Sequence, residues 1–364
     1  MRELKVDLGE RSYPIFIGSS LIEQLPTFFA QYGIHTRSPL MVITDEKVAP
    51  LYLEQVERAL AGAGYRVAKA VVEAGEKSKS LEVLEQLVEI ALTHGLDRQS
   101  TIIALGGGVV GDLAGFAAAT YMRGIRFVQV PTTILAHDSS VGGKVAVNHR
   151  LAKNIIGAFH QPVMVVYDTD TLQTLPMREV RAGLAEVIKH GLIRDRDFVE
   201  WCEEHADRLL HLDREALEYA LYRGCAIKAE IVSQDERESG LRAILNLGHT
   251  IGHALEAVAA YEELLHGEAI SIGMVGAARV AKRLGYGEHI EETTVRILQK
   301  FGLPTHIPAH MDPDQIMKTM SHDKKFKEGK RVFIVPTDIG NATIHHDLSA
   351  ELLKEIVESL MRED

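Results

Sequence analysis

Three glycines lie at a spacing suited to holding a diphosphate. Gly106, Gly108 and Gly111 satisfy the G-x-G-x-x-G pattern between a strand-like run and a helical pattern. Glycines let the backbone approach a phosphate, and the first turn of a helix supplies N–H donors and partial positive charge. The acidic residue usual about 20 positions later is missing, since that stretch is Arg126–Thr133. The pattern therefore predicts a dinucleotide site outside the ordinary Rossmann geometry, with a tight turn packed on a strand as the alternative.

Two further polar segments could bind anions. Gly75–Ser80 could line a nucleotide, although a serine capping the next helix explains this segment without a ligand. Pro131–Lys144, followed by Lys153-Asn154, combines paired hydroxyls, two glycines and lysines among apolar residues. These groups suit a cradle for phosphate or carboxylate, with a surface loop carrying scattered lysines as the alternative.

A set of metal-ligand type lies in the second half of the chain. His249 and His253 are four residues apart and share one helix face, His266 opens the next helical pattern, and Glu186 is a charge inside an apolar helix. Two histidines and one carboxylate can hold Zn²⁺ and leave positions open for substrate. Because the chain has 17 histidines, a chance pair is the alternative. The spacing leaves open whether His253 is a ligand or a proton-transfer group.

Several cations stand in apolar or helical surroundings. Each alone is an ordinary surface residue, but together, in a chain of net charge −11, they indicate a small, multiply anionic substrate. They are Arg123, Lys189, Lys228, Arg242 and the Lys324-Lys325 pair.

Length and composition exclude several classes of protein. The 364 residues predict two domains, and 46% hydrophobic with 25% charged residues is ordinary for a globular chain. The negative charge disfavours binding to nucleic acid or to an anionic membrane. Two cysteines form no disulfide framework, and the first residues lack the apolar stretch of a signal peptide. Ile102–Met122 is apolar but broken by glycines, so we expect no membrane span. The low cysteine count and the missing signal peptide predict a cytoplasmic protein.

The order of elements predicts an α/β domain followed by a mainly helical one. Strands separated by helices imply crossover units and a Rossmann-like, mostly parallel sheet. The predicted strands are Leu4–Leu8, Leu40–Thr44, Tyr65–Val72, Thr101–Leu105, Phe127–Val130 and Val163–Tyr167, and the helices between them Ser20–Tyr32, Val48–Ala61, Ser80–His94 and Val109–Tyr121. Further helices are predicted at Met177–Ile193, Arg214–Val232, Leu247–Ala260, Ile270–Leu284, Glu291–Phe301 and from Ser349, with a hairpin of Arg331–Val335 and Ala342–His345. We expect a nucleotide-binding domain over 1–176, a metal- and substrate-binding domain over 177–364, and an active site in the cleft between them.

Taken together, these segments resemble the 3-dehydroquinate synthase family of sugar-phosphate cyclases. The matching stretches occur in the family's order over nearly the whole chain. They are Gly75–Ser80, Leu105–Gly115, Tyr121–Gly124, Pro131–Lys144, Glu186–Lys189, Lys228–Glu230, Ser239–His253, His266–Glu268 and Asp323–Lys325.

The resemblance implies a reaction and its cofactors. The substrate would be 3-deoxy-arabino-heptulosonate 7-phosphate, and the products 3-dehydroquinate and phosphate, in the shikimate pathway. NAD⁺ would be reduced and regenerated within one turnover, around β-elimination of phosphate, ring opening and aldol closure. Zn²⁺ or Co²⁺ would be the metal, and the active form a homodimer.

The resemblance also implies roles for individual residues. NAD contacts would fall on Asp45, Gly75, Glu76, Lys77, Ser78, Lys79, Gly108, Val109, Val110, Gly111, Asp112, Thr132, Thr133, Lys144, Lys153, Thr171, Leu172, Gln173 and Thr174. The metal ligands would be Glu186, His249 and His266. Substrate and catalytic groups would be Arg123, Asp138, Lys144, Lys153, Asn154, Lys189, Lys228, Arg242, Asn246, His253 and one lysine of the Lys324-Lys325 pair, taken as Lys324.

The chain departs from the family pattern in two places, and other functions compete. The Ile134–His137 segment before Asp138 is one residue shorter than is common, and Ala74 stands where Asp is common. The alternatives are another sugar-phosphate cyclase, such as one feeding aminocyclitol synthesis, a metal-dependent polyol dehydrogenase that releases NADH, and a metal-stabilised nucleotide-binding module without activity. Arg242, with Lys153-Asn154, favours a substrate that carries a carboxylate.

Overall fold

The computed structural model describes residues 1–259, 263–322, 332–346 and 348–361. The chain forms two compact units, of which the first combines Met1–Leu175 with Leu217–Arg237. The second combines Pro176–Ala216 with Glu238–Asp364. These units differ from a single division at residue 176, because most of α9 (Arg214–Gln234) clusters with the first unit.

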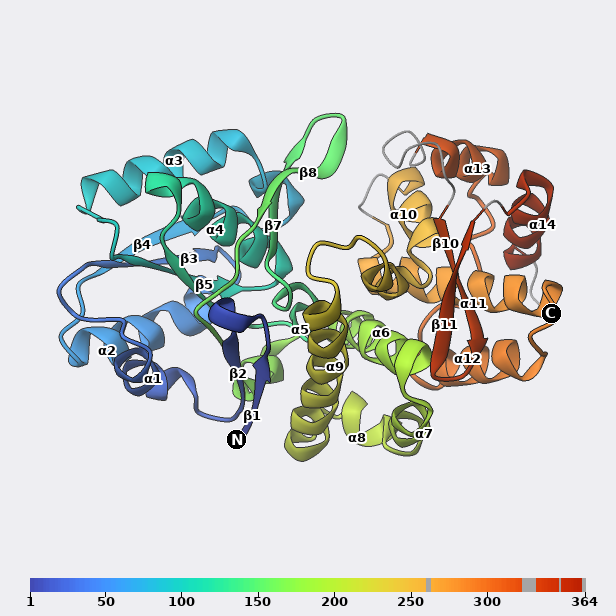
Figure 1. Cartoon of the computed structure of the whole chain (residues 1–364), viewed down its shortest axis with the longest axis horizontal. Coiled ribbons are helices and arrows are strands. Elements are labelled where there is room, and N and C mark those ends of the chain that lie inside the picture. Colours follow the sequence, from blue (N-terminus) through green and yellow to red (C-terminus); the bar gives the residue numbers. More distant parts are fainter. Residues whose placement is uncertain (260–262, 323–331, 347, 362–364) are drawn as a thin grey trace. The chain divides into compact units, whose positions relative to one another are not determined.

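A seven-stranded sheet forms the centre of the first unit (Figure 1). Its order is β1 (Arg2–Val6), β2 (Tyr13–Gly18), β9 (Met164–Asp168), β6 (Arg126–Pro131), β5 (Thr101–Gly106), β3 (Leu40–Asp45) and β4 (Val67–Val72). Only the β1–β2 pair is antiparallel; the five other pairings are parallel. The α/β prediction is confirmed, and β2 is a strand that the sequence patterns missed.

Helices cover both faces of this sheet. Side chains alternate along β3, so Met41 and Ile43 join one apolar core while Leu40 and Val42 join the other. The first core also contains α3 (Leu81–Thr93) and α4 (Gly108–Thr120), and the second contains α1 (Leu25–Gln31) and α2 (Glu54–Gly62). Burial on both faces explains why these strands are apolar throughout rather than alternating.

A hairpin packs on α4. It consists of β7 (Lys144–His149) and β8 (Ala152–Phe159), which the sequence patterns did not predict as strands. A Cβ on Gly115 of α4 would lie 2.3 Å from Val145 Cγ1, so only glycine permits this close approach. The glycine-rich segment therefore has a second structural role, because Gly115 lets the hairpin pack closely on α4.

The second unit is mainly helical, as predicted (Figure 1). Its helix α11 (His266–Arg283) is buried along most of its length and packs against α6 (Met177–Arg194), α10 (His249–Val258) and α12 (His289–Lys300). The remaining elements are α7 (Arg196–Glu204), α8 (Ala206–Leu210), α13 (Pro313–His322), α14 (Ala350–Leu360) and the predicted hairpin, β10 (Val332–Asp338) with β11 (Asn341–His346). Three of these helices, α7, α8 and α13, were not predicted. Among the described residues, no helix has the length and apolar character needed to cross a membrane.

Candidate active site

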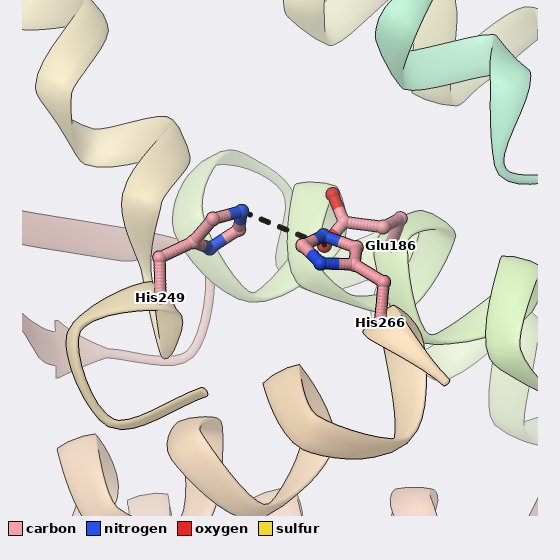
Figure 2. Close-up of side chains that lie close together, drawn as sticks. All are labelled: Glu186, His249 and His266. Atoms are coloured by element: carbon pink, nitrogen blue, oxygen red, sulfur yellow. Dashed lines mark ion pairs between the residues drawn. The ribbon is translucent and has the colours of Figure 1, made fainter. Parts of the chain in front are cut away.

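Three side chains of metal-ligand type converge in the second unit. Glu186 lies within α6, His249 is the first residue of α10, and His266 is the first residue of α11. The Glu186 Oε1 atom is 4.0 Å from His249 Nε2 and 3.8 Å from His266 Nε2. Figure 2 shows the two imidazole rings and the carboxyl group turned toward one another. The predicted ligand set is therefore brought together by three separate helices.

Close helix packing places these ligands. A Cβ on Gly267 would lie 1.9 Å from the Ala182 carbonyl oxygen, so α11 can contact α6 at this point only because glycine follows His266. Likewise, a Cβ on Gly273 would lie 2.0 Å from the carbonyl oxygen of Gly248, the residue before α10. Gly248 has a φ of +80°, a conformation that side chains disfavour, and it turns the chain into the helix that His249 begins.

The carboxyl group of Glu186 has one oxygen engaged and one orphaned. Its side chain is 1% exposed, and Oε2 accepts a hydrogen bond from Lys189 Nζ. Oε1 is buried without any hydrogen-bond partner. A buried polar atom of this kind needs an explanation, and a role as a ligand to a cation would supply one.

The distances fit a small divalent metal ion. Two ligand atoms that are each about 2.1 Å from one Zn²⁺ ion lie at most about 4.2 Å apart. Both distances from Glu186 are below this limit, so the carboxylate can share one ion with either imidazole. Two nitrogens and one oxygen are also the donor types that Zn²⁺ and Co²⁺ accept.

The two histidines differ in how readily they are protonated. His249 Nδ1 donates to the Leu247 carbonyl oxygen at 3.1 Å, which leaves the Nε2 lone pair free. Burial, together with the positive charge of Lys189, lowers the pKa of His249 well below its ordinary value, so this ring is neutral. Burial also opposes protonation of His266, but the hydrogen bond and charge of Glu256 and the charge of Glu186 outweigh it and raise the pKa of His266.

Four predicted substrate groups lie in the same unit. Lys189 is buried beside Glu186, and the ring of His253 is 5.1 Å from that of His249. Arg242 is 2% exposed and sits on the 3₁₀ turn η7 (Leu241–Asn246), which packs against α6. Asn246 ends that turn and donates to Glu238 Oε1 at 2.8 Å. An anion bound at the metal ligands would meet the buried ammonium group of Lys189, and Arg242 is a second buried cation of the same unit.

The glycine turn of the first unit lies where β5 ends and α4 begins. Two of the glycines are required by packing, because a Cβ on Gly106 or Gly111 would lie 2.7 Å from Val110 or Gln129. The hydroxyl oxygens of Thr132, Ser139 and Ser140 are buried there without a hydrogen-bond partner, and a Cβ on Gly108 would lie 3.1 Å from Ser139 Oγ. These observations agree with both interpretations of the glycines. Close packing explains a tight turn, and buried hydroxyls without partners beside a helix N-terminus suit a bound diphosphate.

A polar network joins several predicted NAD and substrate residues. The 3% exposed side chain of Lys79 donates to Asp112 Oδ2 at 2.6 Å and also to Asn154 Oδ1. Burial raises the pKa of Asp112, while Lys79 opposes this rise. Asn148 closes the network, because its amide donates to Glu76 Oε2 at 2.9 Å and its Oδ1 accepts the N–H of Asn154 at 2.9 Å. The sequence patterns did not single out Asn148.

A second ion pair of the first unit involves Lys228 and Asp138. Lys228 Nζ is 2.9 Å from Asp138 Oδ2, and Asp138 lies in the short helix α5 (Ala136–Ser139). The sequence placed Lys228 in the helical domain, whereas α9 carries it with the first unit from Leu217 onward. The shortened segment before Asp138 therefore still brings this carboxylate to a predicted substrate lysine.

The chain matches known families over most of its length. A model described as the N-terminal part of 3-dehydroquinate synthase matches residues 69–182, and a model of the C-terminal part matches residues 183–326. A curated 3-dehydroquinate synthase from Desulforamulus reducens is 51% identical over 350 residues, which cover 96% of this chain and 97% of that protein. The chain belongs to the 3-dehydroquinate synthase family.

Solved structures of other cyclases share the architecture of this 3-dehydroquinate synthase family member. A 2-deoxy-scyllo-inosose synthase complexed with carbaglucose-6-phosphate, NAD⁺ and Co²⁺ is 29% identical, with a TM-score of 0.90 over 99% of this chain and all of that one. A 2-epi-5-epi-valiolone synthase from Streptomyces hygroscopicus with NAD⁺ and Zn²⁺ bound is 28% identical, with a TM-score of 0.88 over 97% and 98% of the two chains.

Several other predicted residues of this 3-dehydroquinate synthase family member stabilise the turns in which they lie. Asp45 accepts the N–H groups of Lys47 and Val48 and so caps the turn after β3. The Thr171–Thr174 turn, which includes Leu172 and Gln173, is held by Tyr52, whose hydroxyl donates to the Thr171 carbonyl at 2.9 Å. In the Gly75–Ser80 segment, the Ser80 side chain caps α3, which agrees with the alternative interpretation that this segment begins a helix without binding a ligand.

The other three predicted cations have different surroundings, and one of them, Lys153, borders the polar network through Glu76. Exposed Lys144 begins β7, and Lys153 Nζ lies 3.6 Å from Glu76 Oε1. Exposed Arg123 follows α4, at the end of that 13-residue helix opposite Gly108, and has a left-handed φ of 70°. At 1.5 Å per residue the two ends of α4 are about 20 Å apart, so Arg123 does not join the glycine turn. The Lys324-Lys325 pair lies outside the described residues.

Proposed function

We propose that this chain is a 3-dehydroquinate synthase, a carbon–oxygen lyase that converts 3-deoxy-arabino-heptulosonate 7-phosphate into 3-dehydroquinate and phosphate. The observation that carries the proposal is the cluster of Glu186, His249 and His266, in which an orphaned carboxylate oxygen lies 3.8 and 4.0 Å from two imidazole nitrogens. In a member of this family, such a cluster supports a divalent cation at the substrate.

In the proposed enzyme the two units hold different cofactors. Glu186, His249 and His266 would hold Zn²⁺ or Co²⁺, while the glycine turn and the Glu76–Lys79 segment would hold NAD⁺. When bound, the metal supplies a Lewis acid and NAD⁺ supplies a hydride acceptor that is restored in each turnover.

The chain's own cations would bind and orient that substrate. Arg242 presents a planar guanidinium, which can grip a carboxylate through two parallel hydrogen bonds. Lys189, held against Glu186, adds a positive charge beside the metal ligands. Such fixed charges favour the loss of phosphate because they stabilise the charge that develops as it leaves.

The proposal also includes a cytoplasmic location and a homodimeric state. Both rest on the family resemblance. The first is also supported by Cys202 and Cys225, which are both free rather than joined in a disulfide of the kind common in oxidising compartments.

One incubation tests the activity. Purified protein is mixed with the heptulosonate phosphate, Zn²⁺ and substoichiometric NAD⁺, and phosphate, dehydroquinate and NADH absorbance are followed together. We expect phosphate and dehydroquinate to form in equal amounts, with no steady growth of NADH. Conversion of the added NAD⁺ to NADH without release of phosphate would instead identify a polyol dehydrogenase. Turnover of sugar phosphates without a carboxylate, in preference to this substrate, would identify another cyclase.

A further inference from the structure

Glu256 is a buried carboxylate that none of the predicted roles uses. It lies on α10, one turn beyond His253, and its side chain is 10% exposed. Its Oε2 atom is 3.2 Å from Nδ1 of His266, the first residue of α11. A carboxylate from one helix therefore contacts the imidazole ring that the next helix offers to the metal.

This contact decides which ring nitrogen of His266 carries the proton. The Nε2 atom is 3.8 Å from Glu186 Oε1, too far for a hydrogen bond, whereas Nδ1 is within hydrogen-bond distance of Glu256. An ionised carboxylate can only accept, so Nδ1 must be the donor. The Nε2 lone pair is then directed to the side where His249 and Glu186 lie.

A second metal ion at Glu256 is the competing explanation. His253, Glu256 and His266 also lie close enough to share an ion. A metal there would need the Nδ1 lone pair of His266 while the first metal uses Nε2. The ring would have to lose both of its N–H protons, whereas a hydrogen bond from Nδ1 to Glu256 requires no such loss. The hydrogen bond is therefore the favoured role of Glu256.

We infer that Glu256 is a positioning residue, which fixes the tautomer and orientation of His266 and strengthens it as a metal ligand. The two histidines then have unequal support. His249 donates to a neutral backbone carbonyl, whereas His266 donates to a buried carboxylate. A carboxylate makes the imidazole more basic toward the metal, and loss of such a partner typically lowers metal affinity about 10–100-fold.

The inference rests on the metal site of the proposed function. The first measurement therefore distinguishes a failure of that metal site from a failure of the role of Glu256. Metal-free wild-type protein is titrated with Co²⁺, and binding is followed by calorimetry and by the visible absorption of the bound ion. If the wild type binds no Co²⁺, the proposed metal site itself fails. If the wild type binds and Glu256→Gln binds equally well, only the role of Glu256 fails.

The expected result is a specific loss of metal affinity. Glu256→Gln keeps the size of the side chain, and we expect the Kd for Co²⁺ to rise at least about tenfold with an altered Co²⁺ spectrum. Glu291→Gln is the matched control, because it removes a carboxylate of the same unit that pairs with Arg279 at 2.9 Å. We expect the control to bind Co²⁺ as the wild type does. Equal losses in both variants would overturn the inference, since they would indicate a general effect on folding.

A double variant tests whether Glu256 acts through His266. If it does, Glu256→Gln should change Co²⁺ affinity little once His266→Ala has removed the ring. Additive losses would show that Glu256 supports the metal by another route and would overturn the inference.

Discussion

The predicted metal region of the second unit and the predicted nucleotide region of the first differ in how their polar groups are satisfied. In the metal region, Glu186 Oε1 is buried without a partner and faces two imidazole nitrogens beyond hydrogen-bond distance. In the nucleotide region, Lys79 donates to both Asp112 and Asn154, and Asn148 donates to Glu76. The first arrangement is completed by adding one ion, whereas a ligand entering the second must exchange existing hydrogen bonds for new ones. We therefore expect the loss of a metal ligand to cost far more binding than the loss of any one group in the nucleotide region.

The strongest test of this comparison removes a metal ligand. His249→Ala leaves two of three ligands, and we expect metal affinity and kcat to fall at least about 100-fold, beyond the range for residues that only support a ligand. Metal content by elemental analysis and steady-state kinetics measure these losses. NAD⁺ affinity should be retained, because the nucleotide network belongs to the other unit. Wild-type metal content in this variant would remove His249 from the ligand set.

Arg242→Lys tests whether the planar shape of the buried guanidinium, and not only its charge, matters for substrate binding. Lysine keeps the charge but loses the two parallel hydrogen bonds, and one charge-assisted hydrogen bond is worth about 1.5–3 kcal/mol. We expect kcat/KM for the heptulosonate phosphate to fall at least about tenfold, with metal content and NAD⁺ affinity nearly unchanged.

Arg279→Lys is a matched control for that experiment. Arg279 is also a buried arginine of the second unit, but it pairs with Glu291 and the Ser359 carbonyl oxygen. This control should lower the Tm without lowering kcat/KM. A loss of NAD⁺ affinity in Arg242→Lys would instead assign Arg242 to the cofactor.

Asn148→Ala tests the smaller loss expected in the nucleotide network. The substitution removes the donor to Glu76 and the acceptor of the Asn154 N–H. Since a hydrogen bond contributes about 1 kcal/mol, we expect NAD⁺ to bind about fivefold more weakly by fluorescence titration, with Co²⁺ affinity unchanged. Gln161→Ala, which removes another amide-to-carboxylate bond of the first unit, is the control and should leave NAD⁺ binding intact. Equal NAD⁺ affinity in Asn148→Ala and wild type would exclude Asn148 from the site.

The smallest expected effect concerns the end of the segment that carries Lys228. Glu236 accepts hydrogen bonds from Arg11 and Gln161, and the Arg11 contact lowers the pKa of Glu236 below its ordinary 4.5. A lowered folded-state pKa adds stability above pH 4.5 that is lost as the pH falls through the lowered value. We expect Glu236→Gln to lower the Tm by about 2–4 °C at pH 7. Calorimetry should show this difference shrinking as the solution is acidified below pH 4, and a constant difference would contradict the prediction.

Local patterns predicted the parts of the fold that local physics determines. The apolar runs of β3, β5, β6 and β9 and the Ser80 cap of α3 follow from burial and capping, which neighbouring residues encode. The β7–β8 hairpin was missed because it depends on packing with a distant segment, whereas α7 was missed although its Asp195 cap and its amphipathic pattern are local. The hairpin in particular is seated by one glycine of another element, Gly115.

The candidate site divides in the same way. Glu186, His249 and His266 were found because family resemblance and residue type both pointed to them. Asn148 and Glu256 were not found. Their hydrogen-bond partners lie 72 and 10 residues away in the sequence, and the type of a polar residue does not indicate which distant residue it will contact. Asn148 ends the apolar run Val145–Val147 and is followed by His149 and Arg150, so its local sequence carries no clear sign of a functional role.

The placement of α9 has a consequence for how this protein is made. The chain leaves the first unit after Leu175 and returns to it for Leu217–Arg237. During synthesis, domains tend to fold from the N-terminus as soon as they have left the ribosome. Here the first unit remains incomplete while the next 41 residues of the second unit, Pro176–Ala216, are being translated. Its Lys228–Asp138 pair forms only after that passage, so a stalled or truncated chain ending near residue 176 lacks one of its own buried cations.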